Sequence, residues 1–355
     1  MAAPSFIPDH TPARGPDRNQ RTSAGAVTSR TPVTGKPASA AGSIAAGPRR
    51  FSRLLRWTIG AAVVVACFYF LGGRLAHDWH KIPWHEIRLS VPLLVSAFLA
   101  MFVWMLVYGF TWKSLLAGLG EHISLFNSVS VLAVSQVGKY IPGKLWFTVG
   151  RMYLAKKHGV SEAKTAVSTA MEIALSLLGA VILFGLAVLL VPSGIIPTRA
   201  YLAFLLVPFC ILAVYPPVLN RVTGFILKRL RQPVFEIRMT FRRLLGILGL
   251  YTLMWIIQGL GCFFLIRCFY PVGLSRLPMV AGAFALSWIL GFVVIVSPAG
   301  LGVREGIFTF ALRLVMPEPV AIIAALLSRI WITGSEGLLA LVFTLAPRLG
   351  KLRIK

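Results

Sequence analysis

Long apolar runs separated by short basic segments dominate this chain. Six of them approach or exceed the roughly 20 residues that a helix needs to cross a bilayer. They cover residues 57–73, 91–112, 165–191, 200–218, 244–268 and 320–346. The pattern predicts an all-α polytopic membrane protein with about six full transmembrane helices.

Two further apolar runs, 123–137 and 277–296, end differently, because each leads directly into a Pro/Gly break and a second short helical segment. The first break reads Tyr140-Ile-Pro-Gly-Lys144 and the second reads Ser297-Pro-Ala-Gly-Leu-Gly302. We interpret both runs as re-entrant helical hairpins, which enter and leave the bilayer on the same side.

The distribution of charge favours this interpretation. Only 13% of the residues are charged, yet the net charge is +25. With both hairpins re-entrant, both termini are cytoplasmic, and the cytoplasmic segments hold 27 of the 36 Lys and Arg, as the positive-inside rule requires. A full crossing by only one hairpin would move either the basic loop 221–243 or the basic C-terminus outside. We therefore expect a bacterial-type inner (plasma) membrane protein. It would consist of a disordered cytoplasmic tail (1–48), a transmembrane domain (49–349) and a basic cytoplasmic tail (350–355).

The two hairpins have opposed topology, since the first starts from the cytoplasm and the second from outside. An offset of 156 residues aligns six identical pairs, among them Pro142 with Pro298 and Gly150 with Gly306. Inverted repeats of this kind build many transporters. Broken backbone at membrane depth is tolerated only where protein buries it or where it lines a wet cavity. We therefore expect the two breaks to meet near the middle of the membrane and to enclose one cavity.

Several functions are disfavoured by the same patterns. The basic residues lie between apolar runs rather than in one patch, so membrane topology explains them better than nucleic-acid binding does. The four cysteines lie in apolar runs without CxxC spacing, and the His-rich segment 77–86 is typical of an amphipathic interfacial segment. We expect no metal site, no cofactor and no catalytic residues, because no GxSxG, P-loop, HExxH or GxGxxG motif occurs in a suitable context.

The first break is rich in hydrogen-bond donors. Lys139, Lys144 and Arg151 flank a backbone opened by glycine and proline, and a helix start near Leu145 provides free N–H groups. A lipid phosphate is the anion expected in this setting. The alternative is that these cations mark a cytoplasmic interface by snorkelling.

The second break contains Arg304 and Glu305, which point about 100° apart on a helix and so do not form a simple mutual pair. One arrangement aims Arg304 at a lipid headgroup while Glu305 pairs with a cation elsewhere. The alternative is a salt bridge at the outer interface.

Three ionisable residues, Glu172, Arg329 and Glu336, lie well inside predicted spans, where a charge is costly unless it is paired or wetted. At the repeat offset Arg329 corresponds to Ile173, next to Glu172, which predicts a Glu172–Arg329 pair across the pseudo-twofold axis. Glu336 follows Arg329 by two turns and shares its face. A static pair that fixes helix register is the alternative to a role in transport.

The paired motifs resemble the lysylphosphatidylglycerol synthase transmembrane, or flippase-like, family. They are the Gly-Lys-Tyr-Ile-Pro-Gly-Lys core of segment 137–151, Glu172, and Ser-Pro-Ala-Gly-Leu-Gly-Val-Arg-Glu-Gly at 297–306. The resemblance covers roughly residues 56–349. It implies a domain that moves aminoacylated or glycosylated lipids, or lipid-linked intermediates, between leaflets. Full-length synthases of that type add a soluble aminoacyltransferase domain after the membrane part. Because this chain ends nine residues after its last predicted span, we expect that activity to be absent.

Together these observations support one main hypothesis and two alternatives. The main hypothesis is a lipid transporter whose cations hold a phosphate, while its carboxylates balance cationic headgroup atoms or carry protons. The alternatives are a membrane transferase acting on a polyprenyl-phosphate-linked sugar and an accessory subunit of a separate lipid-modifying enzyme. The candidate substrate-binding residues are Lys139, Lys144, Arg151, Glu172, Arg304, Glu305, Arg329 and Glu336.

Overall fold

The computed structural model describes residues 69, 72–74, 76–77, 80, 88–140, 146–191, 202, 204–229, 239–293 and 302–352, and within these it contains helices and no strand. The elements are α2 (Val91–Gly118), α3 (Leu125–Gln136), the 3₁₀ turn η2 (Val137–Tyr140), α4 (Trp146–Lys156), α5 (Glu162–Leu190), α6 (Leu206–Ala213), α7 (Pro216–Arg229), α8 (Phe241–Phe269), the 3₁₀ turn η4 (Leu274–Arg276), α9 (Leu277–Val293), α10 (Val303–Leu312) and α11 (Glu318–Leu352). The predicted all-α class is confirmed.

Five helical segments in the described part are long and apolar enough to cross a membrane. They are Val91–Gly118, Glu162–Leu190, Phe241–Phe269, Leu274–Phe292 and Glu318–Leu345. Four correspond to predicted full spans, and the fourth segment in chain order is α9 with η4, which we assigned to the second hairpin. The predicted span at 57–73 lies almost entirely outside the described residues.

The predicted span at 200–218 is wrong in its second half, where the helix breaks. α6 ends at Ala213, and α7 starts anew at Pro216. Pro216 and Pro217 cannot donate backbone hydrogen bonds to a continuing helix, and proline disfavours helical geometry in the residue before it. Apolar residues continue on both sides of Pro216 and Pro217, so the length of the apolar run alone does not show the break.

The centre of the fold is the antiparallel pair α2 and α8. At one end the Ser90 N–H donates to the Cys268 carbonyl oxygen (2.8 Å), and at the other Arg243 Nη2 donates to the Ser114 carbonyl oxygen (3.0 Å). Between these points the helices approach closely at Gly261, where an added Cβ would lie 3.0 Å from the Ala100 Cβ. Small residues therefore set the distance between these two spans, as is common in membrane helices.

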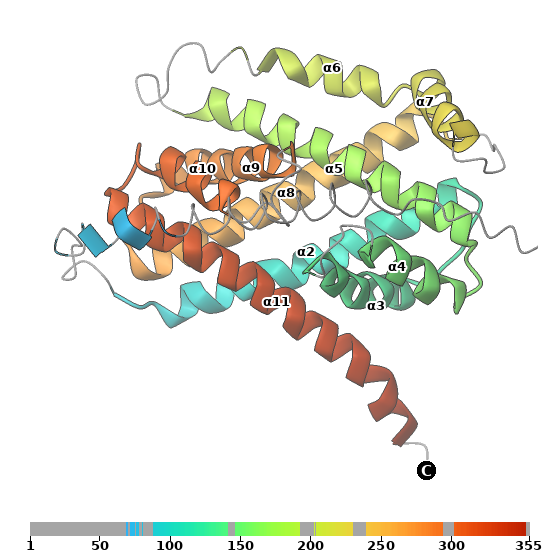
Figure 1. Cartoon of the computed structure of the whole chain (residues 1–355), viewed down its shortest axis with the longest axis horizontal. Coiled ribbons are helices and arrows are strands. Elements are labelled where there is room, and N and C mark those ends of the chain that lie inside the picture. The colour runs from blue at the N-terminus through green and yellow to red at the C-terminus, as the bar shows by residue number, and fades with distance from the viewer. Residues whose placement is uncertain are drawn as a thin grey trace, which may run out of the picture. The chain divides into compact units, whose positions relative to one another are not determined.

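Two helical hairpins pack at opposite ends of these long helices, α3–α4 at one end and α9–α10 at the other (Figure 1). Each hairpin closes on itself tightly. A Cβ at Gly138 would lie 2.9 Å from the Phe147 backbone, and one at Gly291 would lie 3.2 Å from the Arg304 Cβ. In each hairpin the second helix therefore returns alongside the first, as the Pro/Gly breaks predicted.

The element order repeats at the spacing found in the sequence. Moving α4 forward by 156 residues places it on α10 almost to the residue, and the same shift places the start of α5 on the start of α11, Glu162 on Glu318. α2 and α3 likewise fall mostly within α8 and α9. Because α2 and α8 are antiparallel and the hairpins lie at opposite ends, the two halves have the arrangement of an inverted repeat.

Candidate functional site

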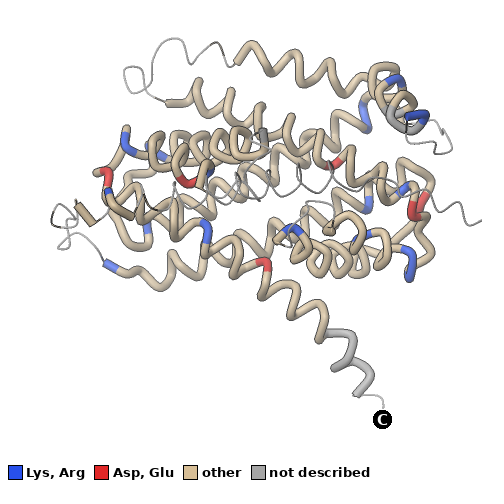
Figure 2. Tube along the Cα trace, in the orientation of Figure 1, with Lys and Arg blue, Asp and Glu red and all other residues tan. Residues whose placement is uncertain are grey.

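Charged side chains inside this fold form two groups, and acidic positions are few along the helices (Figure 2). The first group centres on Arg151 of α4, whose side chain is 0% exposed. Arg151 Nη1 donates to Glu172 Oε2 at 2.6 Å, and Nη2 donates to the Tyr108 hydroxyl at 2.8 Å. The same hydroxyl donates to Glu172 Oε1 and accepts from Gln136 Nε2 at 3.2 Å. The network joins α2, α3, α4 and α5.

Aromatic rings complete the surroundings of this guanidinium. Its carbon lies 5.6 Å from the Trp112 ring centroid and 5.8 Å from those of Tyr108 and Phe147. Cation–π contacts of this length stabilise a desolvated cation. Arg151, expected on the wall of a shared cavity, is instead enclosed in a satisfied network, because the packing of α4 against α5 brings a carboxylate to it. The sequence analysis missed Tyr108 and Gln136, although a tyrosine and a tryptophan one turn apart on a span are a recognisable signal.

The second group gathers around the middle of α11. Lys139 Nζ in the first hairpin lies 2.5 Å from Glu336 Oε1, and the neighbouring Tyr140 hydroxyl donates to Glu336 Oε2 at 2.7 Å. Glu336 is only 2% exposed. Lys139 and Tyr140 therefore hold this part of the first hairpin against α11. Lys139 was a predicted site residue, and Tyr140 was not.

The second hairpin reaches the same helix two turns earlier. Arg329 Nε lies 3.8 Å from Glu305 Oε1, and the Glu305 carboxylate also accepts a hydrogen bond from the Gly302 N–H (2.6 Å). The prediction that Glu305 pairs with a cation elsewhere is thus confirmed. The predicted Glu172–Arg329 pair is wrong, since Glu172 uses its two oxygens for Arg151 and Tyr108, while Arg329 pairs with Glu305.

Arg304 differs from the other cations of this group. Its guanidinium lies 5.0 Å from the Phe284 ring centroid, and no carboxylate of the described part lies within 4 Å of it. Arg304 nevertheless lies within electrostatic range of four charged residues, which are Lys139, Arg329, Glu305 and Glu336. We call these five residues the midplane cluster, after the depth at which the sequence analysis expects the two breaks to meet. It holds three cations and two carboxylates.

A narrow polar crevice without room for a water molecule lies between α9, α10 and α11 beside the midplane cluster. Arg304, Glu305 and Arg329 line it together with the hydroxyl-bearing Ser287 and Ser328. Both serine hydroxyls donate to carbonyls of their own helices, at 2.7 Å each, so their oxygens remain able to accept. Two guanidinium groups and two hydroxyl groups therefore line one crevice.

At the basic end of the fold, exposed pairs mark where helices begin and end. Lys156, in the last turn of α4, lies 2.6 Å from Glu162 in the first turn of α5. That hydrogen bond raises the pKa of the Lys156 ammonium. The pair is largely exposed and contributes little to stability.

Some predicted features lie outside the described residues. They include Lys144, both Pro/Gly breaks and most of the His-rich segment, so the predicted meeting of the breaks in one cavity stays a prediction. Among the residues that the structure does describe, no group of three or more His, Cys, Asp or Glu could hold a metal ion.

The apolar helices, the opposed hairpins and the buried ion pairs define a multi-pass α-helical membrane protein. The chain belongs to the family described as the lysylphosphatidylglycerol synthase TM region, which matches residues 57–334. This match confirms the resemblance carried by the two motifs, and it assigns the chain to membrane proteins of lipid metabolism or transport. No curated protein matches the chain.

Proposed function

We propose that this protein moves an anionic phospholipid or lipid-linked intermediate between the leaflets of the inner membrane, and that the midplane cluster binds its phosphate. The observation that supports this most strongly is the excess of positive charge in that cluster. Glu336 is used by Lys139 and Glu305 by Arg329, which leaves Arg304 without a carboxylate. A charge at bilayer depth is costly unless it is neutralised or wetted, so the site is suited to an anion.

The chemistry of the ligand follows from the residue type. A guanidinium presents planar donors that match two oxygens of a phosphate, and charge-assisted hydrogen bonds of this kind are among the stronger ones. Arg329 lines the same crevice and carries a second guanidinium, which is paired with Glu305. Glu336 and Glu305 already pair with Lys139 and Arg329. In this proposal, either carboxylate can exchange that partner for a cationic atom of the headgroup, or it can take up a proton.

Movement across the membrane is supported by the architecture. In this proposal both hairpins are re-entrant, the termini are cytoplasmic, and the cluster lies where hairpins from opposite sides approach one helix. Inverted repeats give a site near the midplane equivalent routes to both sides. A rocking of one half against the other would then expose the cluster to each leaflet in turn.

The test is transport by Arg304→Gln in liposomes, using a fluorescent phosphatidylglycerol and a quencher that reports only the outer leaflet. One lost charge-assisted hydrogen bond is worth about 1.5–3 kcal/mol, so we expect transport to fall by at least about tenfold. The melting temperature should stay close to that of the wild type, because removing Arg304 strands no carboxylate.

Arg313→Gln is the matched control. Arg313 is the C-cap residue of α10, the helix that carries Arg304. It is exposed, lies 3.3 Å from Glu318 and does not belong to the cluster. This variant should transport as the wild type does. Wild-type transport by Arg304→Gln would refute the proposed headgroup site.

A further inference from the structure

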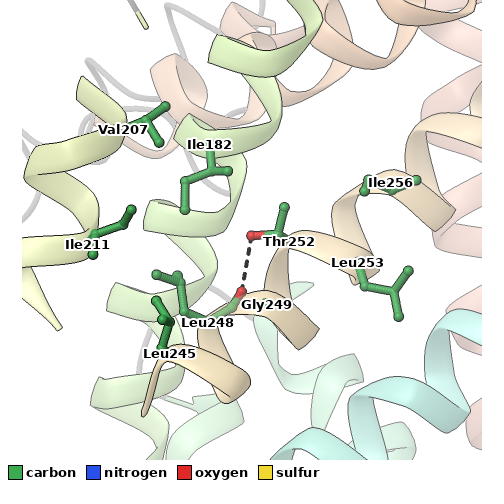
Figure 3. Close-up of a pocket in the computed structure, with 9 residues that line it drawn as sticks. All are labelled: Ile182, Val207, Ile211, Leu245, Leu248, Gly249, Thr252, Leu253 and Ile256. Carbon is green, nitrogen blue, oxygen red and sulfur yellow. Dashed lines mark hydrogen bonds between the residues drawn. The ribbon is translucent and has the colours of Figure 1, made fainter. Parts of the chain in front are cut away.

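An apolar groove of about 330 Å³ lies between α5, α6 and α8 (Figure 3). Its walls are aliphatic side chains that include Ile182 of α5 and Val207 and Ile211 of α6. The one hydroxyl in the lining, Thr252 Oγ1, donates to the Leu248 carbonyl oxygen at 3.0 Å within α8. The groove therefore presents no free donor and favours a hydrocarbon ligand.

Gly249 forms part of the groove lining on α8. It has no side chain, and an added Cβ would meet nothing within 4 Å. The space above this glycine is thus part of the groove, and a larger side chain there would fill the groove without a clash against the backbone.

On α8, the stripe of residues that lines the groove also carries a basic residue. Leu245, Gly249, Thr252 and Ile256 recur at helical spacing on one stripe, and one turn before Leu245 the same stripe carries the exposed Arg242. Arg242 takes part in none of the ion pairs between described residues. From Leu245 to Ile256 the helix rises about 16 Å. The hydrocarbon region of one leaflet has a similar depth, about 15 Å.

The surroundings of that end of the groove are also basic. α7 follows α6 and exposes Arg221, the apolar Phe225 and Lys228 at helical spacing on one stripe. The Tyr215 ring at the α6–α7 junction packs edge-on against Phe241 at the start of α8, with centroids 5.9 Å apart. Exposed apolar and basic side chains on one helix are typical of a helix at an anionic lipid surface.

We propose that the groove and Arg242 form a binding site for one anionic phospholipid, separate from the midplane cluster. An acyl chain lies along Leu245 to Ile256, and the phosphate is bound by Arg242 at the groove's end. A cation at the mouth of an apolar groove of one leaflet's depth matches the two chemical parts of such a lipid. The site goes beyond the proposed transport and does not depend on it.

The experiment uses the purified full chain in mild detergent, stripped of lipid and then incubated with equal amounts of phosphatidylglycerol and phosphatidylcholine. Native mass spectrometry counts the bound lipids. The wild type should retain one phosphatidylglycerol in the groove, beside any that the midplane cluster binds. Gly249→Leu should lose it, because displacement of even two methylene groups corresponds to about a tenfold loss in affinity. Arg242→Gln should bind lipid without preferring the anionic one.

Gly246→Leu is the matched control, since Gly246 is exposed on the same helix, has nothing within 4 Å of an added Cβ and does not line the groove. It should keep the lipid, with a melting temperature equal to that of Gly249→Leu. Arg304→Gln should keep the groove lipid too, so Arg304→Gln combined with Gly249→Leu should retain one phosphatidylglycerol fewer than Arg304→Gln alone. Equal lipid retention by the two glycine variants, or by Arg304→Gln with and without Gly249→Leu, would overturn the proposal. So would a change in oligomeric state of Gly249→Leu without loss of lipid, because a second copy of the chain would then cover the groove.

Discussion

Glu172→Leu tests the buried network around Arg151 most directly. The substitution keeps a side chain of similar volume at a buried position, so it creates little cavity, but it removes the carboxylate that neutralises a guanidinium with 0% exposure. The Tyr108 hydroxyl loses its acceptor in the same step. Arg151 then remains charged inside the protein without an anion.

The expected cost can be worked from these contacts. Breaking a buried pair by removing one partner typically costs about 3–5 kcal/mol. Three aromatic rings between 5.6 and 5.8 Å from the Arg151 carbon still face the cation, and such contacts are each worth about 0.5–2 kcal/mol. We therefore expect the lower end, about 3 kcal/mol, which is roughly a hundredfold change in the folded-to-unfolded ratio.

The assay is reversible unfolding in detergent micelles, followed by tryptophan fluorescence. Arg151→Met combined with Glu172→Leu should recover most of the loss, since replacing a buried ion pair by apolar residues of similar volume is often neutral. Arg329→Ala combined with Glu172→Leu should recover none of it, because Arg329 pairs with Glu305. Glu172→Leu within about 1 kcal/mol of the wild type would refute the reasoning, since a stranded buried charge cannot cost so little. Equal recovery by the Arg329→Ala combination would also refute it.

Two further predictions concern topology and the first hairpin. Single cysteines at Arg229 and Pro271 should react with membrane-impermeant reagents from opposite sides, cytoplasmic and outer respectively, and labelling of both from one side would remove the inverted topology. Gly138→Ala should lower the melting temperature, because its Cβ would lie 2.9 Å from the Phe147 backbone, whereas Gly150→Ala, with nothing within 4 Å, should not. Equal melting of these two variants would mean that the hairpin closes less tightly than its geometry indicates.

The sequence by itself predicted most of the described long helices and the interval within which each hairpin turns. Apolar runs of membrane length specify spans because every backbone group must be satisfied inside lipid. Proline at positions 142 and 298 predicted an interruption of such runs, because proline cannot continue the hydrogen-bond ladder. The adjacency of Arg304 and Glu305 also sufficed to predict that they act separately, because neighbouring helical residues point in different directions.

Only the tertiary structure decided which charges pair. Arg151 meets Glu172 because α4 folds back against the start of α5, and Lys139 meets Glu336 because the first hairpin reaches the middle of α11. The repeat offset pointed to Arg329 as the partner of Glu172, but an offset relates positions in two halves and carries no information on their separation in space. Ion pairs form over about 4 Å, and a distance that short depends on how helices pack rather than on spacing along the chain.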